Sequence, residues 1–208
     1  MRSTYTHFAA RARQVIAALT ISLTLSAGDF PADSVLLDAY LREDMSVWKE
    51  YVNRVEEGTE NRLLYEYGYC GYIVAEAKKE GQEALMPEAK RYVRQFKEHV
   101  NQQKAQLSAG HYEMYLSAVY VFELRLHESI HPIKAMNLAK EATRLAPEDP
   151  VVLSYYGTSL FYAPKPFGDK KEALEWFTKA EQRFREPQWQ YCWLREATRM
   201  YIDKCKAY

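Results

Sequence analysis

The string His127-Glu128-Ser129-Ile130-His131 has the residue types and spacing of a metal-dependent catalyst. On a continuous helix, His-Glu-x-x-His places both imidazoles on one face, where they bind zinc, and the glutamate acts as general base. Pro132 follows directly, and it disfavours the helical conformation at His131. The sequence therefore predicts a connection between two helices here, with no catalytic residue and no metal. A small zinc metallopeptidase that uses His127, Glu128 and His131 is the alternative.

The composition narrows the class of protein further. Lys plus Arg equals Asp plus Glu at 28 each, so the chain lacks the basic excess that nucleic-acid binding requires. There is no glycine-rich loop of the kind that holds phosphate, and the three cysteines have no metal-site spacing, so we predict buried thiols and no cofactor. Only 8 Gly and 8 Pro in 208 residues argue against an all-β protein.

The first 27 residues differ from the rest of the chain. They contain Arg2, Arg11 and Arg13 but no acidic residue, and a largely apolar run over 15–25 precedes Ser26-Ala27-Gly28. This order is typical of a secretory signal peptide. The run is shorter than the roughly 20 residues that span a bilayer. We therefore predict a signal peptide over 1–27, export of the mature part over 28–208, and no stable membrane insertion.

Apolar residues recur with helical spacing from residue 33 to the end. Thr59, Asp149 and Asp169 have the residue types and positions of N-caps, and Pro150 follows one of them at the favoured first helical position. Nothing alternates as strands do. The expected helices cover 33–57, 59–79, 82 or 87 to 107, 111–127, 132–145, 150–163, 169 to the proline at 187, and 189–208.

The helices also repeat one another. Small and large residues recur after 38 positions, and a unit of this length that holds two helices is typical of an α-solenoid. Small residues at such positions let two helices approach closely. In the second helix of the unit, the set Ala135, Ala139, Ala142 recurs 38 positions later as Ala173, Phe177, Ala180. The first helices share an internal spacing, seen in Leu64, Tyr67, Gly68, Gly71 and in Leu153, Tyr156, Gly157, Leu160.

The stretch 111–184 resembles tetratricopeptide repeats. That family has a small residue in its first helix, an alanine, large apolar, alanine series in its second, and a proline near the repeat end, which Pro147 matches. The loop over 162–169, with Phe167-Gly168, resembles a variant in bacterial envelope repeat proteins. This resemblance implies that the mature part, 28–208, is a helical repeat domain in the periplasm or cell envelope of a bacterium. The unit is longer than the usual 34 residues, and the 64–100 hairpin has Phe96 where an alanine belongs. The resemblance implies an all-α fold: a short α-solenoid of about three degenerate hairpins with N- and C-terminal capping helices.

The resemblance also implies a function. In such stacks the first helix of each hairpin lines a concave surface that binds a protein or peptide partner, without catalysis. If Gly68, Ala118 and Gly157 lie in the seam between paired helices, an aromatic-lined groove follows. Two alternatives remain: the aromatic residues pack against the first or last helix, or they enclose a small apolar ligand as in a carrier. The expected groove residues are Tyr65, Tyr69, Tyr72, Tyr115, Phe122, Thr158, Phe161 and Tyr162.

Overall fold

The structure is a computed structural model that describes residues 33–54, 60–128 and 131–207. This part of the chain is helical and contains no strand, so the predicted all-α class is confirmed. The predicted signal peptide over 1–27 and the predicted N-cap Thr59 lie outside the described residues. None of the described helices is long and apolar enough to cross a membrane.

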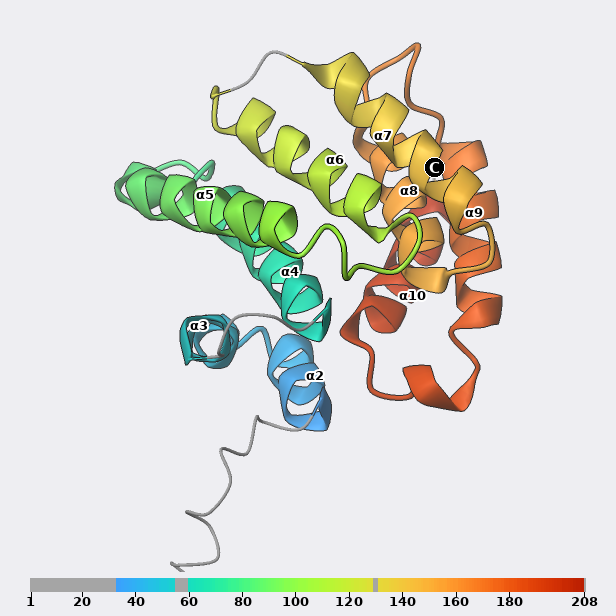
Figure 1. The fold of residues 1–208 in the computed structure, drawn as a ribbon, viewed down its shortest axis with the longest axis horizontal. Coiled ribbons are helices and arrows are strands. Elements are labelled where there is room, and N and C mark those ends of the chain that lie inside the picture. Colours follow the sequence, from blue (N-terminus) through green and yellow to red (C-terminus); the bar gives the residue numbers. More distant parts are fainter. Residues whose placement is uncertain (1–32, 55–59, 129–130, 208) are drawn as a thin grey trace, which may run out of the picture. The chain divides into compact units, whose positions relative to one another are not determined.

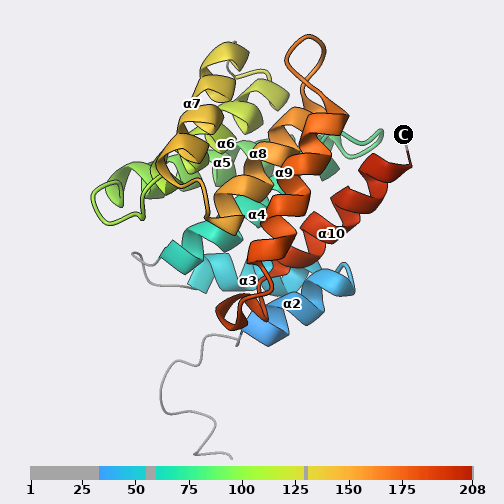
Figure 2. The ribbon, with the colours of Figure 1, turned by 90° about the vertical axis from the view of Figure 1, so that its right-hand side faces the viewer.

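Helices that follow one another in sequence pack side by side (Figures 1 and 2). In addition, α4 contacts α6, α6 contacts α8, and α8 contacts α10, while α2 reaches α10. The two ends of the described chain therefore meet. The helices are α2 (Asp33–Leu41), α3 (Met45–Arg54), α4 (Glu60–Glu76), α5 (Met86–Gln102), α6 (His111–Arg125), α7 (Pro132–Leu145), α8 (Pro150–Tyr162), α9 (Lys170–Arg183) and α10 (Trp193–Lys206), with short 3-10 turns at Glu83–Leu85 and Pro187–Trp189.

The single helix predicted over 33–57 is wrong, because the chain breaks between α2 and α3. Glu43 has a φ of 59°, which a helix does not allow, and Asp44 accepts a hydrogen bond from the backbone N–H of Ser46 at 3.3 Å. The break lets Trp48 fold back on α2. Its indole N–H donates to the carbonyl of Leu36 at 2.8 Å, and the ring is fully buried.

Two aspartates begin α8 and α9, as the sequence predicts. The carboxylate of Asp149 accepts from the N–H groups of Val151 and Val152, and Asp169 does the same for Lys171 and Glu172. Each carboxylate satisfies donors that the first helical turn leaves without an intrahelical partner, and it also opposes the positive end of the helix dipole.

The repeated small residues face the interior. Ala139, Ala142, Ala173 and Ala180 are fully buried, and Ala135 is 4% exposed. A Cβ atom added at Gly157 would lie 2.9 Å from the ring of Phe177 on α9, so this glycine lies in the α8–α9 seam as predicted.

Gly68 is not in the α4–α5 seam, and that prediction is wrong. A Cβ atom there would lie 2.4 Å from the ring of Trp48 on α3 and 2.8 Å from that of Trp193 on α10. The two indoles pack edge to face with centroids 5.1 Å apart, and Tyr40 and Tyr67 pack against Trp193 at 5.5 and 6.1 Å. We call Tyr40, Trp48, Tyr67 and Trp193 the aromatic junction; it joins α2, α3, α4 and α10.

Two glycines one helical turn apart on α4 should respond in opposite ways to the same change. Gly68→Ala should lower the free energy of unfolding by about 1–3 kcal/mol, because its methyl group overlaps two buried indoles. Gly71→Ala should leave it unchanged or raise it by up to ~1 kcal/mol, because its nearest neighbour is Phe122 at 3.8 Å and alanine favours the helix. Urea unfolding of both variants measures the difference. Equal effects at the two positions would contradict the packing at Gly68.

Candidate functional site

The His127 to His131 string does not form the predicted alternative's zinc-binding helix. Helix α6 ends at Arg125, His127 has a φ of 59°, and His131 is the residue before α7. The two imidazoles therefore lack the i, i+4 alignment that a helix gives. Among the described residues, no three His, Cys, Asp or Glu side chains group as metal ligands would.

Two lysine side chains contact the polar atoms of His127 and Glu128. Lys78 Nζ lies 3.0 Å from His127 Nε2, and Lys90 Nζ lies 3.3 Å from Glu128 Oε1. An ammonium group can only donate, so His127 Nε2 is the acceptor. Both polar groups of the string that would act in a zinc peptidase therefore contact lysine side chains.

The expected groove is largely filled. Tyr65, Tyr69, Tyr115 and Phe122 are no more than 5% exposed, so the expectation that they line an open groove is wrong. Tyr65 packs edge to face on Trp48 at 5.3 Å, and Tyr69 packs on Tyr92 at 4.9 Å. The contact of Tyr65 with α3, which lies in the segment predicted as the first helix, agrees with the alternative of packing against the first or last helix. Tyr69 instead packs against α5, which that alternative did not include.

The other four expected residues reach the surface. Tyr162 is 61% exposed and Tyr72 is 38% exposed, while Thr158 and Phe161 are half-buried. Thr158 donates its hydroxyl to the carbonyl of Ser154, and the ring of Tyr72 packs on Tyr69.

Phe161 and Tyr162 belong to a surface that includes residues missed by sequence reasoning. The hydroxyls of Tyr162 and Tyr201 lie 3.1 Å apart, and the ring of Phe161 lies 5.4 Å from that of Tyr201. Burial, and then the bond with Tyr162, raise the pKa of Tyr201; burial, with Glu196 and Tyr162 nearby, raises that of Tyr40. Both phenols are therefore neutral at physiological pH. We call Tyr40, Phe161, Tyr162 and Tyr201 the tyrosine surface.

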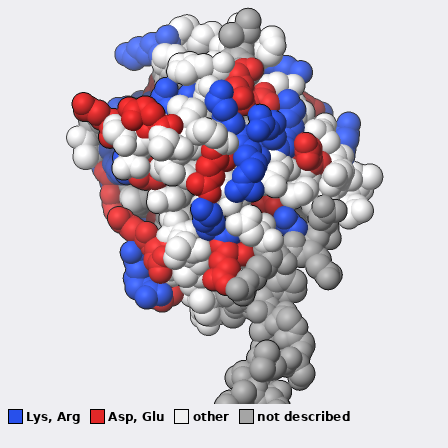
Figure 3. All heavy atoms as spheres, turned by 90° about the vertical axis from the view of Figure 1, so that its left-hand side faces the viewer, with Lys and Arg blue, Asp and Glu red and all other residues white. Residues whose placement is uncertain are grey.

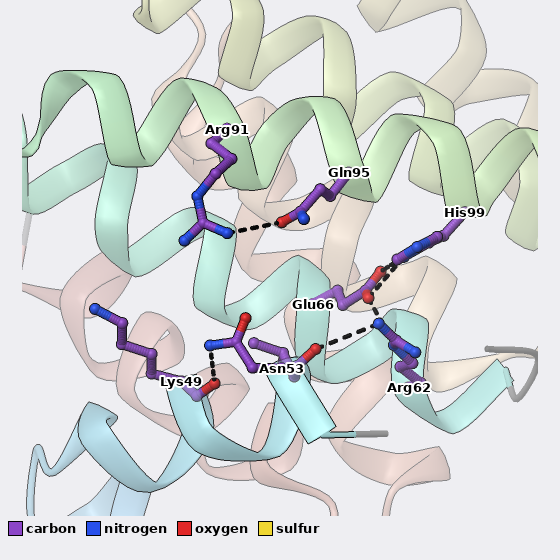
Figure 4. A network of polar contacts seen from close by, with 8 residues as sticks. Lys49, Asn53, Arg62, Glu66, Arg91, Gln95 and His99 are labelled. Carbon is purple, nitrogen blue, oxygen red and sulfur yellow. Dashed lines mark hydrogen bonds and ion pairs between the residues drawn. The ribbon is translucent and has the colours of Figure 1, made fainter. Parts of the chain in front are cut away.

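A buried polar network links α3, α4 and α5 (Figure 4). Glu66 accepts from Arg62 Nε at 2.7 Å, and its two oxygens lie 2.8 and 3.0 Å from His99 Nδ1. Arg62 also donates from Nη2 to the carbonyl of Val52 at 3.3 Å. The side chains of Arg62 and Glu66 are only 8% and 7% exposed. The arrangement gives the buried carboxylate and guanidinium hydrogen-bond partners, and its hydrogen bonds connect the three helices.

Removal of the central carboxylate should be costly. We expect Glu66→Ala to lower the free energy of unfolding by about 3–5 kcal/mol, because the buried guanidinium of Arg62 loses its counter-charge. The exposed Glu80 provides the control, and Glu80→Ala should change the free energy of unfolding by less than ~0.5 kcal/mol. Chemical unfolding of the three proteins tests this, and a loss below ~1 kcal/mol for Glu66→Ala would show that the network does not hold the helices.

A second polar contact joins α6 to the beginning of α8. His111 Nε2 lies 3.1 Å from Asp149 Oδ2. Burial alone would raise the pKa of the Asp149 carboxyl, but the contact with His111 and the N–H groups of Val152 and Val151 outweigh it and hold this pKa below its usual value. The carboxylate form is therefore bound more favourably in the folded state than in the unfolded chain.

The lowered pKa predicts a pH-dependent contribution to stability. The Asp149 carboxylate should stabilise the fold above about pH 4, the ordinary range for aspartate, and lose this contribution as the pH falls through the lowered value. Asp149→Asn keeps a capping oxygen but removes the charge. It should therefore lower the free energy of unfolding by ~1 kcal/mol at pH 7 and by progressively less in acid. Thermal unfolding from pH 7 to 3 measures this difference, and a pH-independent gap between the two proteins would contradict it.

The cysteine thiols are a further group of side chains that could react. Burial raises the pKa of the Cys70 thiol well above its usual value and that of Cys192 to about 11, so neither is a thiolate nucleophile at neutral pH. The three thiols are unpaired; Cys70 and Cys205 are buried as predicted, while Cys192 is half-buried.

Figure 3 shows Lys and Arg side chains next to Asp and Glu side chains over the face where α3 and α5 lie.

Comparison of the chain with protein-family models, with curated proteins and with solved structures gave no match in any of the three.

Proposed function

We propose that this chain is an exported helical-repeat module of the tetratricopeptide type, which binds a protein or peptide partner and performs no chemistry. The repeat part of the proposal is supported by the serial contacts of α4 with α6 and of α6 with α8, as between the first helices of successive hairpins. It is further supported by the buried alanines of α7 and α9 and by Gly157 in the α8–α9 seam. In this reading α2, α3 and α10 are the capping helices.

The tyrosine surface is the proposed contact for the partner, and the exposure of Tyr162 is the observation that carries this proposal. A tyrosine that is 61% exposed, yet fixed by Tyr201 and packed on Phe161, offers a large contact area at low entropic cost. Lys170 lies 5.3 Å from the ring of Phe161, and Lys204 lies 5.3 Å from that of Tyr201. These cations favour a partner segment that carries acidic residues beside apolar ones.

Export is proposed from the basic and then apolar order of residues 1–27, which also defines the mature part as 28–208. The carrier alternative is less well supported, because Trp48 and Trp193 occupy the interior where an apolar ligand would have to lie. The zinc peptidase alternative lacks the helical register that its ligands need.

Affinity capture from an envelope extract of the native organism, with mass spectrometry of the retained proteins, tests the function. The unchanged chain should retain a specific partner, and Tyr162→Ala should reduce its recovery at least tenfold. Tyr191→Ala is the matched control, since Tyr191 is 47% exposed but belongs to the turn before α10.

Two outcomes would contradict the proposal. One is equal retention of the same proteins by Tyr162→Ala. The other is stoichiometric zinc in the purified protein that is lost in His131→Ala, since this would support the peptidase.

A further inference from the structure

The rings of the tyrosine surface are held at fixed angles where α10 packs on α8 and α2 (Figure 2). Tyr162 stands at 84° to Phe161 with centroids 5.0 Å apart, and at 89° to Tyr201 with centroids 5.9 Å apart. On its inner side, Tyr201 stacks on the fully buried Phe177 at 5.2 Å. The exposed ring of Tyr162 therefore meets two others at nearly right angles, and one of these is fixed from beneath.

Hydrogen-bond donors without a partner among the described residues lie beside these rings. The hydroxyls of Tyr40 and Tyr67 are two of them, and both side chains are half-buried. Burial, and then neighbouring phenols, raise the pKa of Tyr67, so its hydroxyl keeps the proton. The indole N–H of Trp193, whose ring packs on both tyrosines, is buried without an acceptor. The Lys204 ammonium, 5.3 Å from the ring of Tyr201, can only donate.

The carboxylate near Tyr40 is already paired. Glu196 lies close enough to contribute, after burial, to the raised pKa of Tyr40. Arg199 Nη1 donates to Glu196 Oε1 at 2.7 Å. A ligand that brings many N–H donors therefore meets a carboxylate that already has a partner. A ligand that brings carbonyl oxygens meets the hydroxyls of Tyr40 and Tyr67.

This set of groups favours a ligand backbone with free carbonyls and few N–H groups. An α-helix uses most of its carbonyls for its own hydrogen bonds. An added β-strand exchanges both groups with a strand edge, and the described residues contain no strand. A polyproline II segment has no internal hydrogen bonds, and each proline lacks the N–H group. Surfaces lined by aromatic side chains are also the usual partners of such segments.

We propose that the tyrosine surface binds a proline-rich segment of the partner in the polyproline II conformation. Carbonyl oxygens of the segment accept from the hydroxyls of Tyr40 and Tyr67, and its pyrrolidine rings pack on Tyr162. An acidic residue beside the prolines pairs with Lys204. The segment is the peptide partner of the proposed function, on which this proposal rests, with its chemical class now named.

Titration of the ¹⁵N-labelled full chain with acetyl-Glu-Pro-Pro-Pro-Pro-Pro-amide tests the proposal. This peptide should shift the amide signals of Tyr162 and Tyr201 saturably, and acetyl-Glu-Ala-Ala-Ala-Ala-Ala-amide, which has the same charge, should bind at least fivefold more weakly. Tyr40→Phe and Tyr67→Phe keep the ring and remove only the hydroxyl, so each should weaken binding by about threefold to tenfold. Tyr191→Phe, at an exposed tyrosine outside this surface, should leave binding unchanged.

The proposal is overturned by the absence of saturable shifts with the proline peptide, by equal binding of the proline and alanine peptides, or by unchanged affinity in both Phe variants. The proposed function is judged separately, by capture. If Tyr162→Ala loses its partner while the proline peptide does not bind, the surface recognises a peptide of another class and only the present proposal fails. Equal capture by Tyr162→Ala would contradict the proposed function and this proposal with it.

Discussion

The missing side chain at Gly68 is the constraint on which the arrangement of the first and last described helices depends. Because α4 presents only backbone there, the indoles of Trp48 and Trp193 lie directly against it, where a methyl group would come within 2.4 Å of one ring. Tyr40 and Tyr67 complete the aromatic junction around Trp193. The N-terminal helices and the C-terminal helix thus meet on α4, and the burial of these large rings stabilises the contact between segments that are far apart in sequence.

In the proposed function, this closure limits where a partner would bind. The aromatic residues that an open stack would present are covered by α3 and α5, so recognition in our account moves to the edge of the junction, where Tyr162 and Tyr201 emerge between α8 and α10. The proposed module would present its contact surface on packed helices, and the buried Arg62–Glu66–His99 network connects three of them.

Local signals in the sequence were sufficient for some elements. The caps Asp149 and Asp169 and the alanine series of α7 and α9 were predicted because capping and close helix packing depend on neighbouring residues. The break at Glu43 was missed, since a charged residue with positive φ carries no turn signal of the kind that glycine gives. The contacts of Gly68 and Tyr201 were missed because each depends on a helix distant in sequence, and no spacing within α4 or α10 specifies that helix.

The proximity of the two indoles is the most direct test of this account. In the folded protein, with isotope labels on tryptophan alone, a nuclear Overhauser experiment should detect cross-peaks between the ring protons of Trp48 and Trp193, whose centroids lie 5.1 Å apart edge to face. Trp48→Phe should remove these peaks and thereby confirm their assignment. Well-resolved ring signals from both residues with no cross-peak between them would contradict the contact of α3 and α10 on α4.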